Sequence, residues 1–210
     1  MLHKETVENT TLELLKGLQS KPYLQEFCLV GGTALALKLG HRKSVDLDLF
    51  TAHSFNVMQM LENLSADFDF QLFYSANNTI KGSIDNVKVD ILAHRYPLVK
   101  EPLIEEGITM LDLQDIIAMK LNAISGSGQR VKDFIDIFYL LRLFNLEQMI
   151  GFYKKKYQQY SEAVVLKSLV YFDDIDFSEW PVLLSEPNLK WEVIKKKLEN
   201  TVNNYMKQNG

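Results

Sequence analysis

Apolar residues recur at two different spacings along the first hundred residues of this 210-residue chain. In residues 5–19 and 57–64 they recur among polar positions at the spacing of one face of a helix. Elsewhere they form short runs or alternate with polar residues, a pattern that is typical of strands. The strands expected on this basis cover residues 27–30, 45–50, 68–74, 80–84 and 87–92. The first hundred residues are therefore predicted to be α/β with a mixed sheet.

A glycine pair interrupts the pattern after the first predicted strand. Gly31 and Gly32 should end that strand, and Thr33 has the hydroxyl side chain of a good N-cap for a short helix. Gly40 stands where a helix commonly ends in a left-handed residue. We therefore expect a tight turn and a short helix between the first two strands.

The second half of the chain has mainly helical spacing. Asp112 is placed to cap a helix that continues to Ile124, and residues 125–128 (Ser-Gly-Ser-Gly) break the pattern. Residues 132–144 then form a strongly apolar helix, and residues 146–210 are mostly helical in pattern. The fold class expected is α/β, of the α+β kind, with a sheet-containing core and a helical domain. The two expected domains cover residues 1–105 and 106–210.

Two aspartates share one face of the second predicted strand. Because side chains alternate along a strand, Asp46 and Asp48 should point to one side. The other side then faces the core with Val45, Leu47 and Leu49. Neighbouring carboxylates repel each other, and burying them unpaired is costly. A divalent cation removes this cost, and hard oxygen ligands of this kind suit Mg²⁺.

A third carboxylate, Asp90, stands on the last predicted strand, opposite a face formed by Val89 and its apolar neighbours. Such a strand can deliver Asp90 beside Asp46 and Asp48. Three carboxylates would hold one or two Mg²⁺ ions, and one of them could act as general base on an attacking hydroxyl. Taken alone, Asp90 fits a solvent-facing strand position equally well, and only the aspartate pair favours the functional interpretation.

Lys120 falls on an apolar helical stripe together with Leu113, Ile117 and Ile124. A lysine in this position either extends its ammonium group to water or points into a site, where it neutralises a triphosphate as a point charge. The spacing leaves both interpretations open.

The helix predicted at residues 132–144 begins with two further aspartates. Asp133 shares a face with Ile137, and Asp136 shares a face with Leu140. Both positions are therefore compatible with an inward-pointing carboxylate, and the spacing does not choose between them.

Composition limits the classes of function. The net charge is −4, so a nucleic-acid role requires a local basic patch. The lysines of residues 154–156 and 195–197 are most simply solvated helix faces, although tyrosines near the first run leave room for RNA contact. The single cysteine, Cys28, forms no internal disulfide. No apolar run approaches the roughly 20 residues of a membrane span, and no signal-peptide pattern is seen, so we expect a cytoplasmic protein with no membrane partner.

These residues together resemble the AbiEii/AbiGii toxin family of nucleotidyltransferases. The resemblance extends from about residue 27 to 145, with the motifs in order. The motifs are Gly31-Gly32-Thr33, Arg42-x-Ser44-x-Asp46-Leu47-Asp48-Leu49-Phe50, the strand with Asp90, the segment from Asp115 to Ala123, and Arg130-x-Lys132-Asp133-x-x-Asp136. The family often has serine after the first glycine, whereas this chain has Gly32 followed by Thr33.

The resemblance implies a polymerase-β-like nucleotidyltransferase core followed by a helical bundle. It assigns nucleotide binding to Gly31, Gly32, Thr33, Arg42, Ser44 and Lys120. Metal binding and catalysis fall to Asp46 and Asp48, with Asp90 matching the third carboxylate of the wider superfamily. Lys120 and Asp133, or Asp136 in its place, complete the implied site.

The implied activity is Mg²⁺-dependent transfer of a nucleotidyl group from an NTP to an acceptor. RNA, notably the tRNA 3′ end, is the implied acceptor, and a cognate antitoxin is the implied protein partner. Two alternatives remain at this stage. One is a non-catalytic nucleotide- or RNA-binding module of the same fold, and the other, less favoured, is a phosphohydrolase of the haloacid dehalogenase type, which also uses Asp-x-Asp at a strand end.

Overall fold

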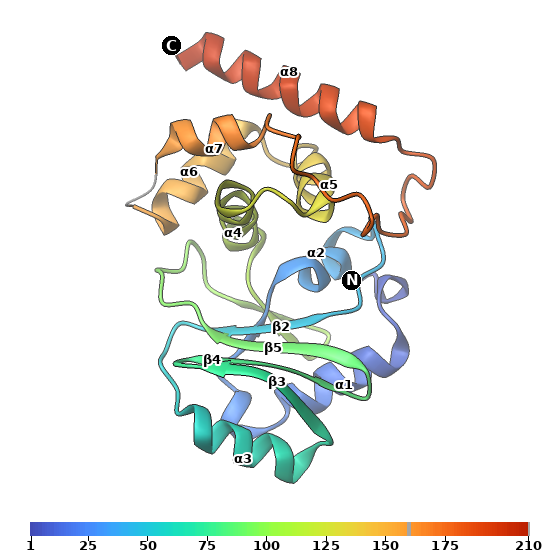
Figure 1. Ribbon diagram of the computed structural model, residues 1–210, viewed down its shortest axis with the longest axis vertical. Coiled ribbons are helices and arrows are strands. Elements are labelled where there is room, and N and C mark those ends of the chain that lie inside the picture. The colour runs from blue at the N-terminus through green and yellow to red at the C-terminus, as the bar shows by residue number, and fades with distance from the viewer. Residues whose placement is uncertain (159–160, 210) are drawn as a thin grey trace. The chain divides into compact units, whose positions relative to one another are not determined.

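A computed structural model describes residues 1–158 and 161–209 of the chain (Figure 1). The chain divides into two compact units, which we call the sheet unit and the helical unit. The sheet unit consists of Met1–Pro97 and Glu101–Asp112, and the helical unit of Leu98–Lys100 and Leu113–Gly210. The short segment Leu98–Lys100 thus belongs to the helical unit, although the chain on both sides of it belongs to the sheet unit.

The described part of the sheet unit contains one seven-stranded sheet with the order β3-β4-β5-β2-β1-β7-β6. Its strands are β1 (Cys28–Leu29), β2 (Leu47–Thr51), β3 (Phe70–Ala76), β4 (Thr79–Ile84), β5 (Val87–Ala93), β6 (Leu103–Glu105) and β7 (Ile108–Met110). The pairs β2–β5 and β1–β7 are parallel, whereas the other neighbours are antiparallel. The sheet is therefore mixed, which confirms the expected fold class. In Figure 1, β2, β5, β4 and β3 follow one another as neighbouring arrows.

Three α-helices pack on this sheet: α1 on β7, α2 on β2 and α3 on β3. Their bounds are Asn9–Gln19 for α1, Gly31–Leu39 for α2 and Val57–Asp67 for α3, and short 3₁₀ turns cover Lys4–Thr6 and Pro22–Leu24. The residues that point into the core of the sheet unit are fully buried. They include Leu29, Leu35, Leu47, Leu49, Ile80, Val89 and Ile91.

The start of α2 differs from the sequence expectation. The helix begins at Gly31, directly after the N-cap residue Val30, so Thr33 lies inside the first turn and is not the N-cap. The hydroxyl of Thr33 contacts the segment before β2 instead of capping the helix. The expected end is confirmed, because Gly40 adopts a left-handed conformation with φ +67° and follows the last helical residue.

The expected inward orientation of Val45 is wrong. Leu47 and Leu49 are fully buried, but Val45 is 58% exposed. The reason is that β2 begins only at Leu47, so the alternation of a strand does not apply to the residue two positions earlier. The sequence pattern also missed β6 and β7, because three residues are too few to show a period of two.

The helical unit contains α4 (Leu113–Gly126), α5 (Val131–Leu140), α6 (Leu146–Lys156), α7 (Glu162–Ser168) and α8 (Trp191–Asn209). Helix α4 begins directly after Asp112, as expected, but it continues to Gly126, so the break at residues 125–128 begins later than predicted. Helix α4 packs against α5, α6 and α7, and α8 packs against α5 and α6. No described helix has the length and apolar character needed to cross a membrane.

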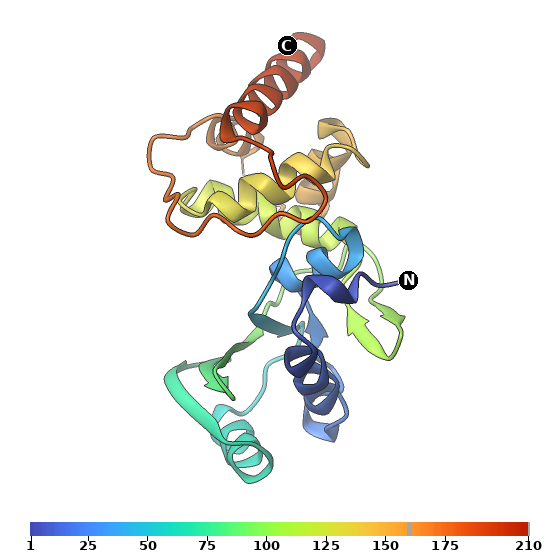
Figure 2. The same cartoon turned by 90° about the vertical axis from the view of Figure 1, so that its right-hand side faces the viewer.

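A connection without helix or strand, residues 171–190, joins α7 to α8 (Figure 2). The expectation of mostly helical structure after residue 146 is wrong for this stretch. Four aromatic rings hold it to the helices, with Phe172 and Phe177 of the connection against Trp191 of α8, and Phe134 of α5 against Phe172 and Trp191. We call residues 171–190 the acidic connection, because residues 171–189 contain five acidic and no basic residues.

Candidate functional site

The turn between β1 and α2 brings the chain against one of the predicted aspartates. Gly31 has φ +68°, a conformation that glycine adopts at little cost. A Cβ atom at Gly31 would lie 3.2 Å from Cγ of Asp48 and still closer to its carboxylate oxygen. The backbone N–H of Val30 also donates to the carbonyl oxygen of Asp48, at 2.9 Å. Glycine is therefore required here both by the backbone angle and by the close approach of Asp48.

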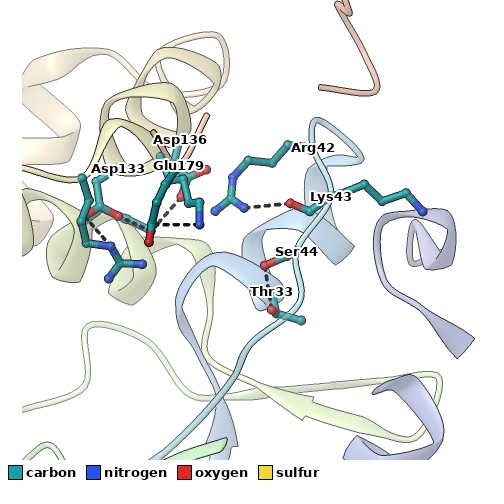
Figure 3. Close-up of polar contacts among 10 residues, drawn as sticks. Thr33, Arg42, Lys43, Ser44, Asp133, Asp136 and Glu179 are labelled. Carbon is teal, nitrogen blue, oxygen red and sulfur yellow. Dashed lines mark hydrogen bonds and ion pairs between the residues drawn. The ribbon is translucent and has the colours of Figure 1, made fainter. Parts of the chain in front are cut away.

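Gly32 has a comparable role toward the segment that precedes β2. A Cβ atom at Gly32 would lie 2.5 Å from Nη2 of Arg42 and 3.4 Å from Oγ of Ser44. The guanidinium group of Arg42 is buried and donates through Nη1 to the carbonyl oxygen of Lys43, at 3.0 Å (Figure 3). The start of α2 therefore meets a cation and a hydroxyl group, both of which can bind phosphate oxygens.

Thr33 fixes this segment to the helix. Its buried hydroxyl donates to the carbonyl oxygen of Asp46 and lies 2.8 Å from the hydroxyl oxygen of Ser44 (Figure 3). Because the single hydroxyl proton of Thr33 goes to Asp46, Ser44 is the donor in the second bond. The glycine turn, Ser44 and Asp46 are therefore held together by one threonine.

Two of the three predicted metal ligands are register partners. Asp48 of β2 lies opposite Asp90 of β5, and the two strands are parallel neighbours. In-register residues of neighbouring strands point to the same face of a sheet. Asp46 directly precedes β2 and is half-buried. The structure thus pairs Asp48 with Asp90, as the sequence predicts.

Asp90 is 6% exposed, so the alternative of a solvent-facing strand residue is wrong. One oxygen, Oδ2, lies 3.3 Å from Nζ of Lys81 and 3.9 Å from Nζ of Lys88. The other oxygen, Oδ1, is buried and accepts no hydrogen bond from the residues that the structure describes. A buried carboxylate oxygen without a donor is a position that a hard cation would stabilise.

The described residues contain no group of three or more His, Cys, Asp or Glu side chains arranged to hold a metal ion. Asp46, Asp48 and Asp90 are therefore not brought together as a ready-made three-ligand centre. The donor set nevertheless fits a hard divalent cation, because it consists of carboxylates and includes the unsatisfied Oδ1 of Asp90.

In the helical unit, Lys120 binds both candidate aspartates of α5. Its Nζ lies 2.6 Å from Oδ1 of Asp133 and 2.7 Å from Oδ2 of Asp136, and all three side chains are buried (Figure 3). Lys120 therefore does not extend to water, so the snorkelling interpretation is wrong. Asp133 and Asp136 both point inward, since both side chains are buried against Lys120.

A second buried ion pair lies on the same helix, and the sequence pattern did not single it out. Asp115 accepts hydrogen bonds from Lys156 Nζ at 2.6 Å and from the backbone N–H groups of Val99 and Lys100. Lys155 Nζ donates to the carbonyl oxygen of Val99, at 2.6 Å. Of the run at residues 154–156, Lys154 and Lys155 are exposed as expected, whereas Lys156 is buried and does not belong to a solvated face. A signal was available, since Lys156 continues the apolar stripe of α6 that includes Met149 and Tyr153.

The start of α5 also carries an exposed charge contact. Lys132 Nζ lies 3.0 Å from Oε2 of Glu179, which belongs to the acidic connection. The hydrogen bond from Lys132 is the main cause that lowers the pKa of Glu179 below its usual value. Arg130 is 59% exposed, and its Nε lies 4.0 Å from Oδ2 of Asp133. The basic residues Arg130 and Lys132 are therefore close in sequence to Asp133, which belongs to the buried group formed with Lys120 and Asp136.

Comparison with known proteins assigns this chain to a family. Residues 13–206 match the profile of the nucleotidyl transferase AbiEii toxin of type IV toxin–antitoxin systems. An uncharacterized protein of Aquifex aeolicus (strain VF5) is 32% identical over 203 residues, which cover 92% of this chain and 95% of that protein.

Solved structures with the same fold include two nucleotidyltransferases. The toxin MenT4 of Mycobacterium tuberculosis H37Rv superposes with a TM-score of 0.60 at 15% identity, covering 92% of this chain and 82% of its own. A structure titled as a putative nucleotidyltransferase from H. pylori superposes with a TM-score of 0.55 at 17% identity, covering 96% of each chain. These two similarities concern the fold, whereas the family match concerns the sequence and excludes the haloacid-dehalogenase alternative. The chain is a nucleotidyltransferase and belongs to the AbiEii toxin family of type IV toxin–antitoxin systems.

Proposed function

We propose that this chain transfers a nucleoside monophosphate from an NTP to RNA, with the 3′ end of a tRNA as the acceptor. In this proposal the reaction depends on Mg²⁺, takes place in the cytoplasm, and is toxic unless a cognate antitoxin is present. Family membership supports nucleotidyl transfer and a toxin role. The observation that carries the proposal is the register pair Asp48 and Asp90 beside the left-handed glycine turn at Gly31.

The carboxylates Asp46, Asp48 and Asp90 would hold the cation. Its positive charge, when bound, stabilises the negative charge that develops on the phosphate in the transition state. The unsatisfied Oδ1 of Asp90 supports this assignment, since a cation would give that oxygen a partner. The contact of Lys81 with the other oxygen shows that Asp90 already attracts positive charge.

The triphosphate would be bound by the start of α2 and the segment before β2. Gly31, Gly32 and Thr33 form the first turn of α2, and the N–H groups of the first turn of a helix have no partner within the helix and can bind an anion. Arg42 and Ser44 lie against Gly32 and add a guanidinium and a hydroxyl group. Without Cβ atoms, the two glycines let the carboxylate of Asp48 and the guanidinium of Arg42 lie close to the backbone of this turn.

Lys120 would neutralise phosphate charge as a point charge. Asp133 and Asp136 orient its ammonium group, because both carboxylates lie within 2.7 Å of Nζ. Of the two, we propose Asp133 as the site residue, since Asp136 is completely buried and Asp133 lies nearer to the exposed Arg130.

The proposed step is an in-line displacement. The hydroxyl oxygen of the acceptor forms a bond to the α-phosphorus, and the bond from that phosphorus to the oxygen bridging the α- and β-phosphates breaks. Pyrophosphate leaves, and the hydroxyl proton passes to a carboxylate of the aspartate set acting as general base. The chain's own contribution is to align these groups and to complement the charge that develops.

Incubation of the protein with each labelled NTP, Mg²⁺ and total RNA tests the proposal directly. We expect one or more nucleotides to enter RNA, and Asp48→Asn to lower incorporation by at least about 100-fold, the scale of loss when one group that stabilises transition-state charge is removed. Asp69→Asn is the matched control, because Asp69 is an exposed aspartate of the same unit.

Each part of the proposal has its own contrary result. Incorporation by Asp48→Asn at the rate of the unchanged protein would refute the metal-binding role of the aspartate pair. Labelled nucleotide that enters protein but not RNA would refute the proposal that RNA is the acceptor. Binding of NTP with no transfer to any acceptor would favour the alternative of a non-catalytic module.

A further inference from the structure

The acidic connection places one carboxylate directly on a cation of the α5 segment. Glu179 Oε2 lies 3.0 Å from Nζ of Lys132, next to Asp133, which binds Lys120 (Figure 3). The family motifs assign no partner to Lys132, and the reaction described above makes no use of Glu179. The contact therefore needs its own explanation.

The placement of Glu179 is fixed by the backbone and by aromatic packing, independently of the ion pair. The N–H group of Asp176 donates to the carbonyl oxygen of Gln129 at 2.8 Å, and Asp176 forms a parallel bridge with Arg130. The carboxylate of Asp176 accepts from the N–H of Ser178 at 2.8 Å, which turns the chain toward Lys132. Phe177 packs edge-on against Trp191.

The ion pair itself contributes little to this placement. The side chain of Glu179 is 60% exposed and that of Lys132 is 23% exposed, so water and salt screen their attraction. A contact of this kind is easily opened by a competing anion. The acidic connection therefore holds a carboxylate in front of a cation without requiring that contact for its own fold.

The charge pattern indicates which anion would displace Glu179 from Lys132. Residues 171–189 contain five acidic and no basic residues, whereas Arg130 and Lys132 are basic and stand within three positions of Asp133, which binds Lys120. An acidic group on an otherwise basic position reduces the affinity for polyanions, because their phosphates must displace it. The net charge of −4 gives the rest of the chain no general affinity for RNA, so a local basic position matters more.

We propose that Glu179 is an intramolecular competitor that covers a phosphate-binding position formed by Lys132 and Arg130, and that a backbone phosphate of the RNA acceptor displaces it. The inference rests on the proposed function, since it concerns the same acceptor. It assigns to the acidic connection the control of acceptor affinity, and it leaves binding of the NTP to the residues named above.

Binding of a fluorescein-labelled oligouridylate, measured by anisotropy without NTP over a range of salt concentrations, tests this proposal. Glu179→Gln is expected to raise the affinity about two- to fivefold, the range that competition from an exposed ion pair allows. The slope of log affinity against log salt should steepen by about 0.7 for each phosphate gained on a single strand. In a Lys132→Met background the same substitution should have no effect, which a double-mutant cycle measures.

Glu186→Gln is the matched control. Glu186 belongs to the same acidic connection and pairs with Arg142 at 2.5 Å, so its substitution removes the same charge and a comparable contact elsewhere. Equal gains in affinity from the two substitutions would overturn the proposal, because net charge alone would then explain them. A gain from Glu179→Gln that persists in the Lys132→Met background would also overturn it, as would a lower KM for NTP with unchanged RNA affinity.

Two further results separate this inference from the proposed function. If labelled nucleotide enters RNA but Glu179→Gln binds oligouridylate like the unchanged protein, the competitor is refuted and RNA transfer stands. If Glu179→Gln strengthens RNA binding as expected but no nucleotide is transferred to RNA, the competitor is supported and the proposed reaction is refuted.

Discussion

Lys156 Nζ lies 2.6 Å from Oδ1 of Asp115, although both side chains are almost completely buried. Burial removes water from both charges, so each depends on the other, and the carboxylate of Asp115 also accepts hydrogen bonds from the N–H groups of Val99 and Lys100. The pair therefore joins α6, the start of α4 and the segment Leu98–Lys100 within the helical unit.

Removal of one partner of this pair should be strongly destabilising. We expect Lys156→Met to lower the free energy of unfolding by about 3–5 kcal/mol, because it leaves a buried carboxylate without its cation. Lys154→Met is the matched control on the same helix: its pair with Glu162 is more than half exposed on the lysine side, and the loss should stay below about 1 kcal/mol. Urea denaturation of the two variants measures the difference, and equal losses would contradict this account.

Lys120 should be important for both stability and transfer, and the two effects are separable. Lys120→Met leaves Asp133 and Asp136 buried without their common cation, so we expect a loss of about 3–5 kcal/mol in unfolding free energy. Adding Asp133→Asn and Asp136→Asn removes both charges and should restore much of that stability. Transfer activity should not return, since the ammonium group of Lys120 and the carboxylate of Asp133 are both absent. A triple variant with recovered activity would show that Lys120 has only a structural role.

Alanine at Gly31 should impair the fold and the site together. The left-handed backbone costs a residue with a side chain about 1–2 kcal/mol, and the added Cβ also meets the carboxylate of Asp48. Gly151→Ala in α6 is the control, because no atom lies within 4 Å of its added Cβ. That substitution should stabilise the protein by about 0.5–1 kcal/mol, as alanine does within a helix. Thermal unfolding and NTP incorporation measure both effects, and a Gly31→Ala variant with full activity would refute the close approach.

The contribution of Glu162 to the free energy of unfolding should be lost in acid. The hydrogen bond from Lys154, followed by that from Tyr205, lowers the pKa of Glu162 below its usual value of 4.5. A lowered folded-state pKa means that the stabilisation is complete above the unfolded pKa and disappears as pH falls through the folded one. The difference in unfolding free energy between the unchanged protein and Glu162→Gln should thus be largest above about pH 5 and vanish in stronger acid. A difference independent of pH would contradict the assignment.

Local pattern was a good guide where an element was long or had a strict period. The alternation along β2 and along β5 correctly placed Asp48 and Asp90 on a common face, and Gly40 correctly marked the end of α2. The start of α2 could not be predicted, because it depends on a tertiary contact: Thr33 bonds Ser44 and Asp46, which are distant in sequence.

The buried polar groups show the same limit. Asp133 and Asp136 both point inward because one lysine from another helix lies between them, and their spacing alone could not show this. The contact of Glu179 with Lys132 joins residues 47 positions apart through a connection that has no periodicity at all. Such contacts follow from packing, which a single sequence does not display.

The segment Leu98–Lys100 has a consequence for how this chain can be divided. Because it belongs to the helical unit while residues on both sides belong to the sheet unit, the backbone passes between the units at three places. A fragment that stops at residue 112 would retain Val99 but lose Asp115 and Lys155, which bind its N–H and carbonyl groups. We therefore expect exchange of the helical unit between relatives to succeed only when residues 98–100 are exchanged together with residues 113–210. The unit that must be exchanged is thus not one continuous segment of the sequence.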